Sequence, residues 1–182
     1  MARRVHIFDP PDRFVCGTVG PVGERTFFLQ AIAGPRIISV ALEKVQVAVM
    51  ADRIGAILAE LDRRGTAPAL QATVEQDERP LDEPLREEFR VGTIALSWDE
   101  DQGVLEVEAR AQTDDPEVLE VERDDDDEGP DLVRVRISPL AARGFVERAA
   151  RIVAGGRPPC PFCGQPLEPQ GHLCPRRNGY LN

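Results

Sequence analysis

Lysine is almost missing from this chain of 182 residues, because Lys44 is its one lysine and every other basic side chain is arginine. Histidine occurs twice, and neither the phosphate-binding pattern Gly-x-x-x-x-Gly-Lys nor the serine-hydrolase pattern Gly-x-Ser-x-Gly is present. We attribute the excess of arginine over lysine to coding bias in preference to phosphate recognition. These absences leave few side chains from which a catalytic site can be assembled.

Long apolar runs are also absent: none approaches the roughly 20 residues that a membrane-spanning helix requires. The basic N-terminal residues are not followed by the apolar stretch of a signal peptide. We therefore expect a soluble, cytoplasmic protein. In that reducing compartment, clustered cysteines are more plausible as metal ligands than as disulfides.

Charge is distributed unevenly along the chain, whose formal net charge is −10. Residues 1–74 carry a net charge of +2, residues 75–131 one of −18 and residues 132–182 one of +6. An acidic protein is a poor general binder of nucleic acid because the phosphates repel it, but the basic C-terminal part keeps that function open locally. The side chains there that suit phosphate contacts and base stacking, and that we predict as possible partner-binding residues, are Arg157, Arg176, Arg177 and Tyr180.

An acidic segment over about residues 112–131 contains five consecutive carboxylates, Asp124–Glu128. Clustered carboxylates can hold a hard cation. This run has no alternation of ligands and no glycine at a sharp turn, and like charges repel one another and stay solvated. We predict a solvated loop, with binding of a metal or a basic partner as the alternative.

The chain contains two similar stretches, since Phe14–Val19 and Phe89–Ile94 both read Phe-x-x-Gly-Thr-aliphatic. A strand pattern followed by a helical pattern then begins near Val40 in the first half and near Val135 in the second. If the acidic segment is an insertion, the halves nearly superimpose, which indicates two copies of one unit. Chance similarity between short strands remains the alternative.

The predicted fold class is α+β. Two pseudo-symmetric βββα units would form a mostly antiparallel sheet arrangement carrying two helices, one from about Val45 to Gly65 and one from Ser138 to Gly155. Ser138 is the expected N-cap of the second helix, with a proline at its first turn. The expected organisation is a domain over residues 1–156, with halves of about 5–65 and 87–156, and a zinc-ribbon-like tail over residues 157–182.

The tail holds the strongest chemical signal. Three of the four cysteines and one of the two histidines fall within fifteen positions. Two thiolates two residues apart can bind one metal ion from a single tight turn. We predict tetrahedral Zn²⁺ in a closed, structural site, in which no coordination position remains for catalysis. The predicted ligands are Cys160, Cys163, His172 and Cys174.

The tail resembles zinc-ribbon knuckles of the Cys-Pro-x-Cys-Gly-x-Pro-Leu type, in which a second Cys-x-x-Cys pair follows ten residues later. Cys174 keeps that spacing, but the expected partner position holds Arg177, which cannot bind zinc. His172 is the available replacement. A three-cysteine site, or a site completed by another molecule, remains open.

The longer string Cys-Pro-x-Cys-x-x-Pro-Leu-x-Pro-x-Gly-His-x-Cys-Pro-Arg-x-Asn-Gly-Tyr, from Cys160 to Tyr180, resembles the C-terminal signature of an uncharacterised actinobacterial family. The similarity extends over the whole chain and includes the Phe-x-x-Gly-Thr-Val-Gly run that begins at Phe14. Members are domains of unknown function. Their genes often lie beside those of a histidine-phosphatase-like and a lipid-kinase-like protein, which implies a shared pathway and nothing sharper.

Other candidate sites are weaker. His6 lies close in sequence to Asp9 and Asp12, an arrangement open to a base and its orienting group, but a lone strand histidine is more often structural. Cys16 is expected to be a small buried hydrophobe. The repeated pairs Gly17-Thr18 and Gly92-Thr93 are expected to mark a bulge or close backbone packing, with a shared site as the alternative.

These features favour a non-catalytic interaction or adaptor protein that binds a protein partner. The alternatives are a nucleic-acid or ribonucleoprotein-binding factor that uses the basic tail, and an enzyme acting on a phosphorylated or small-molecule substrate. The sequence does not decide whether the protein is an enzyme.

Overall fold

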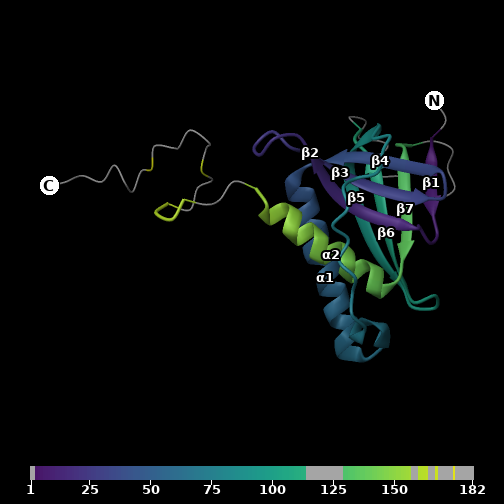
Figure 1. Cartoon of the computed structure of the whole chain (residues 1–182). Helices are drawn as coiled ribbons and strands as arrows, with labels where there is room; N and C mark the ends of the chain where they lie inside the picture. Colours follow the sequence, from purple (N-terminus) through teal and green to yellow (C-terminus); the bar gives the residue numbers. More distant parts are fainter. Residues whose placement is uncertain (1–2, 114–128, 157–159, 164–166, 168–173, 175–182) are drawn as a thin grey trace.

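The computed structural model describes residues 3–113, 129–156, 160–163, 167 and 174. It confirms the α+β class: seven strands form one mixed sheet in the order β1-β7-β6-β5-β4-β3-β2, and two long helices pack on it (Figure 1). Four of the strand pairs are antiparallel, whereas β1 with β7 and β4 with β5 are parallel. The strands are β1 Val5–Phe8, β2 Arg13–Val19, β3 Thr26–Ala33, β4 Arg36–Leu42, β5 Glu87–Asp99, β6 Val104–Ala111 and β7 Leu132–Ile137.

Each half of the chain contains the same order of elements. Strands β2, β3 and β4 form an antiparallel meander that leads into helix α1, Lys44–Arg64, and β5, β6 and β7 form a second meander that leads into helix α2, Pro139–Ala154. This order agrees with two βββα units, although the duplication itself stays a prediction. Strand β1 precedes the first unit and pairs with the last strand of the second.

The helices begin and end where their local signals indicate. At the start of α2, Ser138 Oγ accepts a hydrogen bond from the backbone N–H of Ala141 at 3.2 Å, which confirms the predicted N-cap. At the end of α1, Gly65 adopts a left-handed φ of 66°, which glycine adopts at little cost. Neither helix is long and apolar enough to cross a membrane, and the same holds for every helix in the described ranges.

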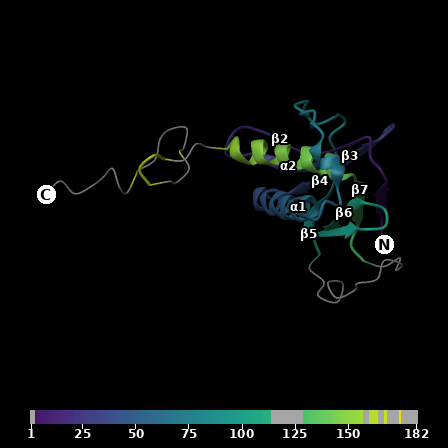
Figure 2. The same cartoon turned by 90° about the horizontal axis from the view of Figure 1, so that it is seen from below.

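The core lies between the helices and one face of the sheet (Figure 2). Helices α1 and α2 lie side by side, so each buries its apolar stripe against both the sheet and the other helix. The buried members of this core from the helices and the second meander include Val47, Met50, Ile54, Ala142, Phe145, Ala149, Leu105, Val107, Ala109, Val133, Val135 and Ile137.

The outer face of the sheet differs between the halves. Over β6 and β7 it is lined by directly opposed ion pairs, Glu106 with Arg136 and Glu108 with Arg134, as the alternation of apolar and charged residues predicts. Over β2 to β4 it is covered by the connector, which we define as residues 66–86 and which contains the short 3₁₀ helix η1, Pro68–Gln71. The acidic run Asp124–Glu128 lies outside the described residues.

Candidate functional site

Three cysteines of the tail come together. The Sγ atoms of Cys160, Cys163 and Cys174 all lie within 4.8 Å of one another, and Cys160 and Cys174 are buried. The Cys160 and Cys174 sulfurs are 3.8 Å apart, which is far beyond the roughly 2.05 Å of a disulfide bond. The structure therefore brings together, as free thiols, all three cysteines that the sequence nominated as metal ligands.

The spacing of these sulfurs suits a tetrahedral metal ion. With Zn–S bonds of about 2.3 Å, two sulfurs on one edge of a tetrahedron are about 3.8 Å apart. That is the separation of Cys160 from Cys174. The backbone N–H of Phe162 also points to the Cys160 sulfur at 3.5 Å, as a turn that stabilises a thiolate would place it.

The ionisation of Cys160 is favoured by its neighbours. Burial raises the pKa of this thiol. Hydrogen bonds from the backbone of Cys163 and Phe162 and from the other two thiols lower the pKa by more than burial raises it, so the pKa lies below the ordinary value of 9.0. A thiolate is the form that binds a metal ion. The arrangement can therefore act as a soft three-sulfur metal site.

The fourth predicted ligand, His172, lies outside the described residues, and so do the predicted partner-binding residues Arg157, Arg176, Arg177 and Tyr180. Among the described part of the tail, Phe162 stands out because 54% of its surface is exposed. This aromatic ring sits between the first two cysteines of the cluster.

Cys16, the fourth cysteine, is fully buried in the core on β2. Burial raises the pKa of its thiol to about 11. It therefore acts as the small hydrophobe that the sequence predicts, far from the conditions that a reactive thiol requires.

His6, Asp9 and Asp12 do not assemble into a base and its orienting group. The carboxylate of Asp9 pairs with Arg136, and that of Asp12 accepts the backbone N–H of Gly34 at 2.7 Å. His6 instead lies in β1, with Nε2 at 3.8 Å from a carboxylate oxygen of Glu88. Each carboxylate is thus used elsewhere, and the structural role expected of His6 stays a prediction.

The two Gly-Thr pairs occupy separate places, each at a close approach. A Cβ on Gly17 would lie 2.6 Å from the side chain of Leu81, and one on Gly92 would lie 2.8 Å from the backbone of Gln112. The strand register also shifts at Gly92, as in a β-bulge. Gly17 borders a cleft lined by the connector and α2, whereas Gly92 borders a different cleft beside α1. The packing interpretation is confirmed, and the pairs do not line one common cleft.

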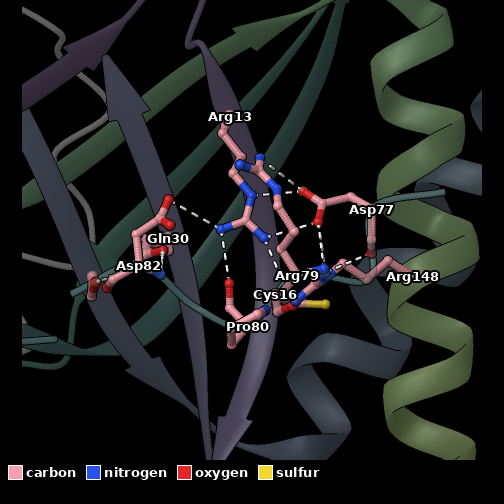
Figure 3. Close-up of polar contacts among 9 residues, drawn as sticks. Arg13, Cys16, Gln30, Asp77, Arg79, Pro80, Asp82 and Arg148 are labelled. Carbon is pink, nitrogen blue, oxygen red and sulfur yellow. Dashed lines mark hydrogen bonds and ion pairs between the residues drawn. The ribbon is translucent and has the colours of Figure 1, made fainter. Parts of the chain in front are cut away.

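A largely buried polar cluster joins two arginines from different halves through one shared carboxylate, and Arg13 also pairs with Asp82 at 3.1 Å (Figure 3). Arg13 on β2 donates from Nε to Asp77 at 2.6 Å, and Arg148 on α2 approaches the same carboxylate at 3.2 Å. Arg148 also donates to the backbone carbonyls of Cys16 and Arg79, each at 2.7 Å. We call Arg13, Asp77 and Arg148 the arginine network.

The arginine network holds the connector against strand β2 and helix α2. Hydrogen bonds from Arg13 hold the pKa of Asp77 below its ordinary value, while burial lowers the pKa of Arg148. Gln30 on β3 completes the attachment, because its amide donates to the Asp82 carbonyl and accepts the Asp82 N–H, each at 2.9 Å. These contacts use backbone atoms and engage every member within the protein, which is the pattern of a structural cluster.

Sequence reasoning missed this network, although a signal was present. Arg148 interrupts the apolar stripe of α2 between Phe145 and Ala149, and Arg13 opens an otherwise apolar strand. A charged residue on a buried face requires a partner. The partner, Asp77, lies in a connector without periodicity, so its identity could not be read from the pattern.

The comparisons with known proteins extend over both parts of the molecule. The family profile described as "Protein of unknown function (DUF3090)" matches residues 6–174, a range that includes the α+β body and all three clustered cysteines. No match was found among curated proteins or among solved structures. Because the match covers most of its length, the chain belongs to the DUF3090 family.

Proposed function

We propose that this protein is a non-catalytic interaction protein whose tail is organised by one structural Zn²⁺ ion. The observation that carries the proposal is the convergence of the Cys160, Cys163 and Cys174 sulfurs within 4.8 Å. His172 is the proposed fourth ligand, because it lies two positions before Cys174 and imidazole suits zinc. A Cys3His set leaves no open coordination position, so the ion would shape the tail and not activate a substrate.

The exposed surface beside the cysteine cluster favours a protein as the binding partner. The exposed ring of Phe162 lies on the turn between two of the metal ligands, where metal binding would hold it in one position. A rigid exposed aromatic side chain buries much apolar area at little entropic cost, which is why such residues are enriched at protein interfaces. Nucleic-acid binding through the basic tail is the competing function and becomes an outcome of the test below.

Metal content tests the first half of the proposal. Protein purified without added metal should contain about one zinc per chain, and the double variant Cys160→Ser, Cys163→Ser should contain almost none. Cys16→Ala is the matched control, because this thiol lies in the core and its loss should leave the metal content unchanged. A red protein with charge-transfer absorption would identify iron instead, and a folded tail without metal would refute the site.

An affinity capture from native lysate tests the second half. The full chain should retain a defined protein partner after nuclease treatment, and the variants Cys160→Ser and Phe162→Ala should lose it. Capture of RNA or DNA with a steep dependence on salt would replace the adaptor function with nucleic-acid binding. A metabolite that copurifies with the protein would instead favour an enzyme.

A further inference from the structure

A second candidate binding surface lies on the body, between α1 and β5. This cleft, of about 580 Å³, has Ile94 and Leu96 of β5 on one side and Val45 and Val49 of α1 on the other. Val45 is 65% exposed and Val49 45% exposed, although both belong to the helix that packs on the sheet. Exposed valines one turn apart on a packed helix leave apolar surface that a ligand could bury. We call this cleft the α1–β5 groove.

The groove also contains a free strand edge. Strand β4 pairs with β5 only at Glu87 and Arg90, and no described strand pairs with the later part of β5 on that side. Alternate residues of a strand direct their N–H and C=O groups to each edge, so this part of β5 presents unpaired backbone groups to the groove. Gln46 of α1 satisfies the first of them, since its Nε2 donates to the Val91 carbonyl at 3.2 Å.

The corresponding place in the other half is filled by the connector. There α2 lies beside β2, the first strand of the meander that leads into α1. In the same way α1 lies beside β5, the first strand of the meander that leads into α2. The connector passes beside both elements: Arg148 of α2 donates to the carbonyls of Asp77 and Arg79, and the Leu81 side chain lies against Gly17 of β2. In this fold a helix beside a strand edge thus accepts a segment of chain that is held through its backbone carbonyls, one carboxylate and one aliphatic side chain.

The α1–β5 groove carries the matching polar group. Arg53 follows Met50 by three positions on α1, as Arg148 follows Phe145 on α2. Arg53 lines the groove, is exposed, and makes no hydrogen bond or ion pair with any described residue. None of the described residues that line the groove is acidic, although the chain as a whole carries a net charge of −10. The groove thus selects a ligand with negative charge beside apolar surface.

From these observations we infer that the α1–β5 groove binds an extended peptide segment of a partner protein, with an aliphatic side chain placed on Val45 and Val49 and a carboxylate placed on Arg53. The peptide would add to the free edge of β5, a recurring mode of peptide recognition. This inference deepens the interaction function proposed above by naming a surface and a partner class, but it does not involve the metal centre.

A peptide copied from the connector provides the probe. A nonapeptide with the sequence of residues 74–82 contains the groups through which the connector contacts Arg148 of α2 and Gly17 of β2. These groups are the carbonyls of Asp77 and Arg79, the Asp77 carboxylate and the Leu81 side chain. Titrated into the full-length ¹⁵N-labelled protein, it should shift the amide signals of Gly92–Leu96 and of Val45–Arg53. We expect Val49→Glu to raise the Kd at least about fivefold, and Val22→Glu, an exposed valine outside the groove, to leave it unchanged.

A charge exchange adds a second measurement that does not depend on loss of binding. Arg53→Glu should weaken binding of the probe and should strengthen binding of a probe in which lysine replaces the residue corresponding to Asp77. Cys160→Ser should bind the probe as the wild type does, so a failure of the zinc site would not be mistaken for a failure of the groove.

Three results would overturn the inference. The first is the absence of shifts in the groove at about 1 mM probe, a concentration that would reveal even millimolar affinity. The second is binding that appears only after residues 114–128 are deleted, since the occupant would then be this chain itself. The third is self-association that Val49→Glu abolishes, which would make the groove a contact between two copies.

Discussion

Removal of the Asp77 carboxylate is the most informative test of how the body is held together. Asp77→Ala leaves the guanidinium groups of Arg13 and Arg148 buried, with side-chain exposures of 7% and 8%, and without their shared counter-ion. Breaking a fully buried pair by removal of one partner costs about 3–5 kcal/mol. Asp77 itself is 27% exposed, Arg13 keeps the Asp82 carboxylate at 3.1 Å, and both arginines keep backbone carbonyl acceptors. We therefore expect a loss of about 2–4 kcal/mol in the free energy of unfolding.

Chemical denaturation monitored by circular dichroism measures this loss directly. For a protein of this size, about 3 kcal/mol corresponds to a decrease in Tm of roughly 6–12 °C. Asp52→Ala is the matched control, because Asp52 is exposed on α1 and makes no contact with the described residues that the substitution would remove. That control should change stability by less than about 0.5 kcal/mol. A loss below about 1 kcal/mol for Asp77→Ala, or equal losses for the two variants, would refute the role of the arginine network.

The same network predicts the direction of a pH effect. Hydrogen bonds from Arg13 depress the pKa of Asp77 in the folded protein below its ordinary value of 3.8. Its contribution to stability is therefore complete above that value and is lost as the pH falls through the lower, folded-state pKa. The difference in stability between wild type and Asp77→Asn should be constant from about pH 5 to 7 and should shrink in more acidic solution. A difference that grows on acidification would contradict this assignment.

Three further predictions concern single positions. Gly92→Ala should destabilise the protein by about 1–3 kcal/mol in urea unfolding, because the new methyl group would lie 2.8 Å from the Gln112 backbone, and an unchanged midpoint would contradict that contact. Ser138→Ala should cost about 1 kcal/mol through loss of the hydrogen bond from Ala141, whereas Ser138→Asp should retain most of the stability. Cys16 should resist a thiol reagent in the native protein and react on unfolding, since burial raises its pKa to about 11; rapid labelling at pH 8 would show that it is accessible.

Much of the fold could be predicted because its signals are local. The alternation of Val133, Val135 and Ile137 with arginines indicates a strand with one charged face, and the structure confirms it. The helix over Lys44–Arg64 and the N-cap at Ser138 likewise follow from periodicity and capping within a few residues. The cysteine cluster was predictable in part for the same reason, since Cys160 and Cys163 share one turn.

The remaining features could not be predicted because they depend on contacts between distant segments. No local pattern indicates that β4 and β5 pair in parallel, or that this pairing stops at Arg90 and leaves a free edge beside α1. The connector has neither helical nor strand periodicity, so its path over the outer face of β2 to β4 is invisible in the sequence. As a result, the sheet carries charged pairs on one half of that face and a covering segment on the other.

The sequence by itself determined the class of the fold, the limits of its helices and the positions of its cysteines, because periodicity, capping residues and short spacings act over one or two turns of chain. Only the tertiary structure decided which charges meet. Arg13 and Arg148 are 64 and 71 positions from Asp77, and their pairing depends on how the connector folds back between β2 and α2. The α1–β5 groove arises in the same way, because its apolar surface and its arginine come together only when α1 lies beside a part of β5 with which β4 does not pair.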